Sequence, residues 1–274
     1  MDPVTPAAAL VTLLMGAVAG SLGAMLGIGG GVFLVPFLVL VVGLPFHQAA
    51  AVSLAAVVAT STAVSAATVG RHLVNLRLGM VLEVATAAGG LAGGLTAQML
   101  SPARLQVIFA VFALVVAGAV VRRGPARPVP GDADPGRLGG RFLDEQTGGE
   151  VTYAVRRLPA GLAASFLAGN LSTLLGIGGG VIKVPVLVTW CGVPMRVAAA
   201  TSSFMIGVTA TSGAVIYYGH GDMIPVLAAS AVVGTQVGSG FGLWAAARAR
   251  AQGLRLLLAA VLTAVAVLML VKGL

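Results

Sequence analysis

The sequence predicts an all-α polytopic membrane protein made of two homologous halves. Apolar residues account for 58% of the chain and charged residues for 9%, whereas a soluble domain carries about 25% charged residues. Several apolar runs reach the roughly 20 residues that a membrane-spanning helix needs. One glycine-rich stretch occurs twice, at an offset of 149 residues. The alternating pattern typical of a transmembrane barrel is missing, so the predicted spans are helices.

The repeated stretch reads Leu-Gly-Ile-Gly-Gly-Gly-Val and is followed three residues later by Val-Pro. It covers residues 26–32 in the first half and 175–181 in the second. The same offset continues beyond the stretch without a gap. The further matched pairs are Gly43 with Gly192, Pro45 with Pro194, Ala49 with Ala198, Ala50 with Ala199, Gly70 with Gly219, Gly89 with Gly238, Gly93 with Gly242 and Leu105 with Leu254. Two segments, roughly 7–123 and 156–272, are therefore copies of one unit.

Each half is predicted to contain five helical segments in the same order. The first half has them at residues 7–26, 32–43, 47–69, 78–100 and 103–122. The second half has them at residues 156–175, 181–192, 196–218, 226–247 and 252–271. The second segment of each set has about twelve residues and a length of about 18 Å, too short to cross a core of ~30 Å. It is either a half-helix or one arm of a re-entrant pair.

A linker separates the two halves. Residues 123–157 are rich in arginine, proline, glycine and aspartate, which is a linker composition. We expect a first transmembrane repeat at 1–123, a cytoplasmic linker at 124–155 and a second repeat at 156–274. The end of the linker is predicted to form a small β-hairpin, with strands at 141–146 and 150–155 around a Thr-Gly-Gly turn.

The distribution of positive charge predicts how the halves insert, because cytoplasmic loops are enriched in Lys and Arg. An odd number of crossings in each half places thirteen arginines on one side and leaves Arg104 and Lys272 on the other. Four crossings in each half give a weaker asymmetry of ten against five. The sequence therefore favours inverted repeats with the linker in the cytoplasm and both termini outside. A parallel four-plus-four arrangement stays as the alternative.

The two glycine-rich breaks are the first candidates for a binding site. Glycines in the middle of an apolar segment leave backbone polar groups unpaired, and these must be buried in protein or face a cavity. A break followed by a short helix also directs free N–H groups and the positive end of the helix dipole inward, which suits an anion. The alternative is that these glycines only permit close helix packing. The candidate residues are Gly29, Gly30, Gly31, Gly178, Gly179 and Gly180.

Two ionisable residues interrupt the apolar segments, and such residues are costly in membranes and often functional. Lys183 follows the second break by three residues, where the first half has Leu34. It could neutralise an anionic substrate or extend to the membrane interface. Glu83, opposite Val232 in the repeat, is the candidate for proton coupling. It lies only a turn or two from a predicted helix start, so an interfacial position is the alternative.

Hydroxyl side chains cluster on the helix after each short segment and could hydrogen-bond the oxygens of an anion. Serine and threonine also pack and bond their own helix carbonyls in membranes, so a single residue carries little information. The better candidates are Ser53, its repeat mate Ser202, and Ser203. The clusters are Ser53, Thr60, Ser61, Thr62 and Ser65 in one half, and Thr201, Ser202, Ser203, Thr209, Thr211 and Ser212 in the other.

Other classes of function find little support in the sequence. The net charge of +8 comes mostly from arginines that flank apolar segments, so nucleic-acid binding is not expected. The three histidines lack the spacing of a metal site, the single Cys191 excludes a cysteine-based cluster, and no cofactor is predicted. No paired-carboxylate or nucleophile motif indicates an enzyme.

The repeated Leu-Gly-Ile-Gly-Gly-Gly and Val-Pro motifs, with Asp144, Tyr153 and Arg156-Arg157 at the end of the linker, resemble the TauE/SafE sulfite exporter family over nearly the full chain. That family is related to toluenesulfonate-uptake permeases. The resemblance implies a bacterial inner-membrane permease for small sulfur-containing anions such as sulfite, sulfoacetate or other sulfonates, driven by the proton gradient. The residues by themselves favour an anion and a transporter, whereas the sulfur comes from the family alone.

The sequence thus leads to one hypothesis for mechanism. The two breaks face each other near the membrane midplane and hold the anion, and rocking of one half against the other exposes it to each side in turn. The expected partners are the anionic substrate and membrane lipids, with assembly of several copies left open. A passive anion channel and an intramembrane enzyme are the alternatives.

Overall fold

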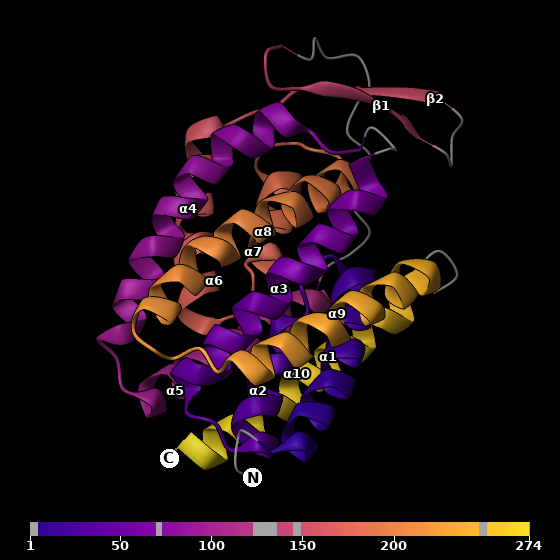
Figure 1. The fold of residues 1–274 in the computed structure, drawn as a ribbon. Coiled ribbons are helices and arrows are strands. Elements are labelled where there is room, and N and C mark those ends of the chain that lie inside the picture. Colours follow the sequence, from indigo (N-terminus) through magenta and orange to yellow (C-terminus); the bar gives the residue numbers. More distant parts are fainter. Residues whose placement is uncertain (1–4, 70–72, 123–135, 145–148, 247–250, 274) are drawn as a thin grey trace.

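The computed structural model describes residues 5–69, 73–122, 136–144, 149–246 and 251–273. The first half begins with α1 (Pro6–Leu26), the first glycine break and the short α2 (Gly31–Phe37), which a π-helical turn extends over Leu38–Val42. Three longer helices complete this half (Figure 1): α3 (Phe46–Val69), α4 (Leu76–Gln98) and α5 (Pro102–Arg122).

The second half repeats this series. It contains α6 (Leu158–Leu175), α7 (Gly180–Thr189), α8 (Met195–Gly219), α9 (Pro225–Ala246) and α10 (Ala251–Gly273). α6 ends, and α7 to α10 begin, 149 residues after the matching points of the first half, as the sequence repeat requires. All ten predicted segments are present as helices, most with ends within two residues of those predicted.

The helices make the protein a multi-pass membrane protein, as predicted. Among the described residues, seven helices are long and apolar enough to cross a membrane: α1, α3, α4, α5, α6, α8 and α9. The segments Gly31–Val42 and Ala259–Val271 are apolar but shorter. Many large apolar side chains are exposed on the outer helices, such as Val84 at 74% and Val237 at 69%. These residues suit contact with lipid.

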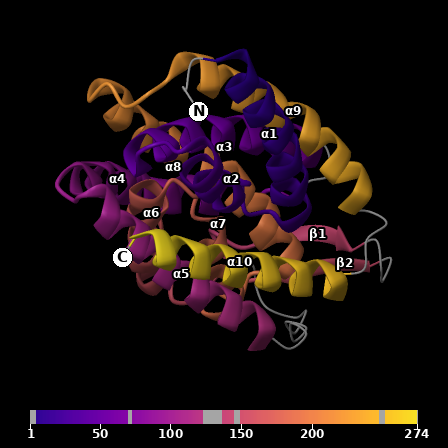
Figure 2. The same cartoon turned by 90° about the horizontal axis from the view of Figure 1, so that it is seen from below.

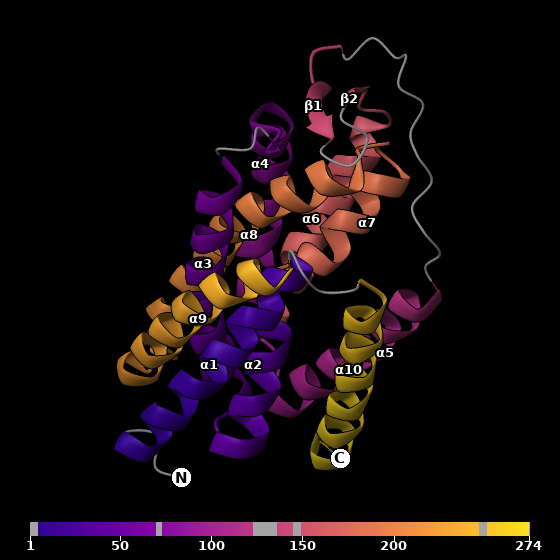
Figure 3. The ribbon, with the colours of Figure 1, turned by 90° about the vertical axis from the view of Figure 1, so that its right-hand side faces the viewer.

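The linker forms the predicted hairpin. Strand β1 (Gly140–Asp144) pairs antiparallel with β2 (Gly149–Tyr153), with Gly140 opposite Tyr153. The hairpin lies at one end of the molecule, whereas both termini lie at the other end (Figures 1 and 3). The Asn75 amide donates to the Tyr153 hydroxyl oxygen at 2.8 Å. Burial raises the pKa of Tyr153, and this hydrogen bond opposes the rise.

The packing of the helices follows the repeat. α1 lies along α9, and α6 lies along α4 in the matching arrangement. The central contact joins α3 to its mate α8, while α5 and α10 pack together at the edge of the bundle (Figures 2 and 3). Exchanging the two halves therefore maps the α1–α9 contact onto the α4–α6 contact, and maps the α3–α8 and α5–α10 contacts onto themselves. Such an exchange is expected when two copies of one unit associate.

Glycines permit the close approach of α1 to α9 and of α4 to α6. A Cβ atom at Gly238 would collide with the Ala17 carbonyl, and one at its repeat mate Gly89 would collide with the Phe166 carbonyl. Gly93 and Gly242 meet the facing backbone in the same way. Small residues at these crossings bring helix backbones into van der Waals contact, which drives association in membranes.

A leucine at Gly238 should therefore destabilise the fold, because its side chain has no room against α1. We expect a loss of about 1–3 kcal/mol, the usual cost of overpacking. Gly240 is the control, because it lies two residues along α9 and a Cβ placed on it would meet no atom within 4 Å. In thermal unfolding in detergent, the melting temperature of Gly238→Leu should be well below that of Gly240→Leu. Equal melting temperatures for the two variants would contradict this account of the α1–α9 contact.

Candidate functional site

The two glycine breaks share one backbone conformation. In the first break, residues 27–31, the φ angles of Gly27, Gly29 and Gly30 are 68°, 86° and 74°. In the second break, residues 176–180, the matching glycines have φ angles of 70°, 85° and 70°. Residues with a Cβ rarely adopt this left-handed conformation. The helix breaks predicted from the sequence are thus present, and the pattern Gly-x-Gly-Gly is what their backbone requires.

The breaks satisfy part of their own hydrogen bonding. The Ile28 amide donates to the Gly23 carbonyl at 3.1 Å, and its mate Ile177 donates to Ser172 at 3.0 Å. On the other side of each break, the amide of Phe33 donates to Gly30 at 3.0 Å and that of Ile182 to Gly179 at 3.2 Å. Internal bonds of this kind allow irregular backbone to lie inside a helical bundle without contact with water.

The two breaks touch each other in the interior of the protein. A Cβ atom at Gly31 would lie 2.5 Å from the Gly176 carbonyl oxygen, and one at Gly180 would lie 2.8 Å from the Gly27 carbonyl oxygen. The Ser53 hydroxyl donates to the same Gly176 carbonyl at 2.7 Å, which ties α3 to the second break. Residues far apart in the sequence thus form one central site.

The side chains between the breaks obey the repeat as well. Val57 of α3 and its mate Ile206 of α8 lie against Gly29, and both also lie against Gly178. The approximate two-fold relation between the halves therefore passes through the place where the breaks meet. Both halves thus contribute side chains to the place where the breaks meet.

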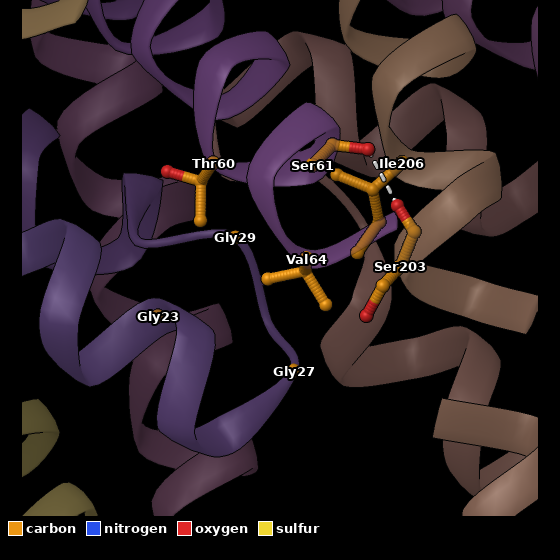
Figure 4. A pocket seen from close by; sticks show the side chains of 8 residues that line it. All are labelled: Gly23, Gly27, Gly29, Thr60, Ser61, Val64, Ser203 and Ile206. Atoms are coloured by element: carbon orange, nitrogen blue, oxygen red, sulfur yellow. Dashed lines mark hydrogen bonds between the residues drawn. The ribbon is translucent and has the colours of Figure 1, made fainter. Parts of the chain in front are cut away.

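A small pocket adjoins the first break (Figure 4). It is lined by glycines, two apolar residues and three hydroxyl residues from α3 and α8. Each hydroxyl donates to a helix carbonyl: Thr60 to Ala56 at 3.1 Å, Ser61 to Ser203, and Ser203 to Ala199 at 2.9 Å. The lining residues are Gly23, Gly27, Gly29, Thr60, Ser61, Val64, Ser203 and Ile206.

The pocket is too small for a polyatomic anion in this conformation. Its volume is about 10 Å³, which is about the space that one water molecule needs. To bind an anion, the three hydroxyls must rotate away from their carbonyls and the walls must separate. The described conformation is therefore a closed one at this pocket.

The two candidate ionisable residues form a buried group with a threonine. The Lys183 ammonium of α7 lies 3.7 Å from Glu83 Oε2 of α4. Thr209 of α8 lies between them, with its Oγ1 at 2.9 Å from Lys183 Nζ and at 2.8 Å from Glu83 Oε1. Lys183 is 2% exposed and Glu83 is 7% exposed. Both side chains thus lie inside the protein, where they face each other rather than solvent.

The remaining predicted residues differ in their surroundings. Ser203 lines the pocket, Ser53 bonds the second break, and the Ser202 hydroxyl is buried with no hydrogen-bond partner among the described residues. Ser202, Ile206 and Thr209 follow one another on one buried face of α8. This face thus connects the pocket and the breaks with the Glu83–Lys183 pair.

Thr60, Ser61 and Thr209 belong to the pocket or to the ion pair, although the sequence did not select them from its hydroxyl clusters. Thr60 and Thr209 are repeat mates, since they lie 149 residues apart. Thr60 faces the pocket, whereas Thr209 holds the ion pair. Comparison of the clusters at the repeat offset leaves three matched pairs, Ser53 with Ser202, Thr60 with Thr209 and Thr62 with Thr211. The structure separates the last pair from the others, because Thr62 and Thr211 are exposed.

The chain matches a known protein family over most of its length. The family model for "Sulfite exporter TauE/SafE" covers residues 12–269. A Bacillus subtilis (strain 168) protein named "Probable membrane transporter protein YunE" is 26% identical over 240 residues, which is 85% of this chain and 86% of that protein. No solved protein structure gives a significant match.

Two plant proteins are similar over shorter segments. The "Sulfite exporter TauE/SafE family protein 6" of Arabidopsis thaliana is 41% identical over 75 residues, 27% of this chain and 17% of that protein. The family protein 5 of the same plant is 49% identical over 55 residues, 20% of this chain and 12% of that protein. The sequence identity to the two plant proteins is thus higher than that to the bacterial protein, but it extends over a much smaller part of this chain.

Proposed function

This chain belongs to the TauE/SafE sulfite exporter family, and from that premise we propose that it is a secondary transporter for a small sulfur-containing anion such as sulfite or an organosulfonate. The observation that carries the proposal is the contact between the two glycine breaks at the centre of the bundle. A membrane transporter with duplicated halves is expected to bind its substrate where discontinuous helices of the halves meet.

The chemistry around the breaks suits an anion. Short helices begin at Gly31 and Gly180, and a helix N-terminus carries a partial positive charge. Hydroxyls of Thr60, Ser61 and Ser203 line the adjoining pocket and can donate to oxygens. Lys183 supplies a full positive charge from the second half. Sulfur, rather than another central atom, is proposed from the family alone.

The proposed architecture is a pair of inverted repeats, residues 1–123 and 156–274, joined by a cytoplasmic linker at 124–155. Both termini lie at the end of the molecule opposite the hairpin, which supports an odd number of crossings in the first half. The arginine count of thirteen against two supports the same arrangement. The termini are then periplasmic in a bacterial inner membrane.

Transport proceeds by alternating access in this proposal. The pocket of about 10 Å³ admits about one water molecule, so the described conformation fits an occluded or substrate-free state. Opening requires the central α3–α8 contact to shift while the tight α1–α9 and α4–α6 pairs stay together. Each pair combines one helix from each half, so we propose that these pairs move as bodies, in place of the rocking of one half against the other that the sequence analysis expected.

Proteoliposomes test the proposed function directly. We expect the purified protein to accumulate labelled sulfite or a labelled sulfonate against its concentration gradient when the lumen is made alkaline relative to the outside. Liposomes without protein are the control. Flux that only equalises concentrations would favour a passive anion channel. Conversion of the compound would favour an enzyme, and absence of flux for every sulfur anion would contradict the proposed cargo.

A further inference from the structure

The buried Glu83–Thr209–Lys183 group leaves one polar atom without a hydrogen bond. Lys183 Nζ donates to Thr209, and Thr209 lies within hydrogen-bond distance of Glu83 Oε1. Glu83 Oε2 is buried and receives no hydrogen bond from the described residues, with Lys183 Nζ at 3.7 Å as its nearest ionic partner. The carboxylate is therefore held mainly as a counterion for Lys183, and its hydrogen bonding is incomplete.

The repeat shows what this group replaces. At the matching positions of the other half, Lys183 corresponds to Leu34 and Glu83 corresponds to Val232. Thr209 alone has a polar mate, Thr60, and Thr60 faces the pocket. The charged pair is thus an addition to one half of a symmetric frame. Packing alone does not require charged residues at these positions, because the first half has Leu34 in place of Lys183 and the second half has Val232 in place of Glu83.

The buried ammonium requires one negative charge at all times. A lone buried charge is strongly unfavourable, whereas a paired one is tolerated. In the described conformation Glu83 supplies that charge. An anionic substrate at Lys183 would make two negative charges for one positive charge unless the carboxyl group becomes neutral. The substrate and the Glu83 carboxylate therefore compete for the same ammonium.

From this competition we infer that the Glu83 carboxylate takes the place of the substrate anion at Lys183 while the site is empty. When Glu83 takes up a proton, its carboxyl group leaves Lys183 and the anion binds there. When that proton is released, the anion leaves and the carboxylate pairs with Lys183 again. The proton enters with the anion, as one carboxyl hydrogen for one bound anion, and both leave on the other side. The inference rests on the proposed function, since it specifies how the proposed anion transport is coupled to protons. It identifies Lys183 as the residue that contacts the anion, and Thr209 as the residue whose hydroxyl contacts both Lys183 and Glu83.

The charge balance has a specific consequence. With an anion bound, the group consists of neutral Glu83, cationic Lys183 and one anion; without it, the group is the Glu83–Lys183 ion pair. Both forms are neutral for a monovalent anion, so each cycle carries one proton and one negative charge together. Transport then responds to a pH gradient and not to membrane potential.

Other titratable residues are too distant to take over this role. α4 and α7 pack against α6 and α8, and the other ionisable side chains of these four helices are Arg77, Arg196, Tyr217 and Tyr218. Arg77 lies six residues before Glu83, about 9 Å along the helix, and Arg196 lies about 20 Å along α8 from Thr209. The two tyrosines lie at least eight residues after Thr209, about 12 Å or more. Within the described part of these four helices, Glu83 and Lys183 thus have each other as charged partners.

Anion binding to the purified full chain tests the inference. Methanesulfonate is the main probe because it keeps its charge over the working range, and sulfite is the second probe. For the wild type, Kd should rise by about tenfold per pH unit above the titration of Glu83, because one proton is bound with each anion. Glu83→Gln removes the competing carboxylate, so its Kd for methanesulfonate should be lower than that of the wild type at every pH above the titration of Glu83. A Kd in Glu83→Gln equal to or higher than that of the wild type in this range would overturn the inference.

The double variant Glu83→Gln/Lys183→Met separates loss of the site from loss of the fold. It leaves no buried charge and should fold, but it should bind neither probe. Binding as tight as that of Glu83→Gln alone would overturn the role of Lys183. In proteoliposomes, Glu83→Gln should allow downhill exchange and lose accumulation driven by a pH gradient. The wild type should not accumulate methanesulfonate in response to a potassium diffusion potential, and methanesulfonate uptake driven by that potential would contradict the neutral cycle.

A failure of the cargo can be distinguished from a failure of this inference. If the wild type binds and transports neither probe, the proposed sulfur anion is wrong. The melting temperature of Glu83→Gln is then measured with nitrate and chloride, because an unpaired buried Lys183 gains from any small anion. A rise with these salts that is absent in the double variant would support the exchange of counterions. No rise in either variant would overturn it.

Discussion

Valine at Gly31 should abolish transport while leaving membrane insertion intact. A Cβ atom at this position would lie 2.5 Å from the Gly176 carbonyl oxygen, 2.8 Å from Ser53 Oγ and 2.9 Å from Val57. The two breaks must then separate, and the Ser53–Gly176 hydrogen bond is lost with them. Such overpacking costs about 1–3 kcal/mol, which a multi-helix protein can survive. The geometry of the site, however, depends on sub-ångström contacts, so flux in proteoliposomes should fall below detection.

Gly118 provides the matched control for this prediction. It also lies within a helix, α5, but it is exposed and no atom lies within 4 Å of a Cβ placed on it. Gly118→Val should therefore transport normally. Gly180→Val, the repeat mate of the first variant, should lose transport as well, since its Cβ approaches Ile206 and the Gly27 carbonyl. Normal flux through both Gly31→Val and Gly180→Val would contradict a functional site at the junction of the breaks.

Methionine at Lys183 should raise the substrate concentration needed for half-maximal transport by at least about tenfold. A charge-assisted hydrogen bond contributes about 1.5–3 kcal/mol, which corresponds to roughly 10- to 150-fold in affinity. The apolar side chain itself should fit, because the mate of Lys183 in the first half is Leu34. Initial rates of uptake at increasing sulfite concentration measure the effect.

The stability of this variant needs its own control. Removal of Lys183 leaves Glu83 buried opposite a thioether, and an unpaired buried charge costs about 3–5 kcal/mol. The double variant with Glu83→Gln removes that cost, so it should recover the wild-type melting temperature but not the transport. An unchanged substrate requirement in Lys183→Met would show that the lysine only fills space and pairs with Glu83, and would remove it from the anion site.

The helices and their breaks could be read from the sequence because they depend on local properties. The glycines at positions 27, 29 and 30 permit the left-handed backbone that the break needs, and a run of apolar residues predicts a span. Because the two halves repeat at an offset of 149 residues, each helix predicted in one half also predicted its counterpart in the other. The hairpin was also correctly placed, since a Thr-Gly-Gly turn between short strands is a local signal.

The candidate site could be predicted only as a list of residues without partners. Its sequence signals identified Lys183 and Glu83 separately, as unusual charges in apolar segments. The interfacial alternative for Glu83 rested on its distance from the helix start, and that distance does not say which face of the helix is covered. α7 and α8 bury Lys183, and α4 presents Glu83 to it, through contacts between segments 100 residues apart.

By itself, therefore, the sequence determined the class of protein, its duplicated halves, the positions of the helices and the two glycine breaks. Each of these follows from composition, periodicity or backbone conformation over a few neighbouring residues. Only the tertiary structure decided that the breaks touch, that a pocket of water size adjoins Gly27 and Gly29, and that Lys183 pairs with Glu83 through Thr209. These features arise from the packing of side chains between helices distant in sequence, and apolar helices of similar composition carry no local signal of which partner they will meet.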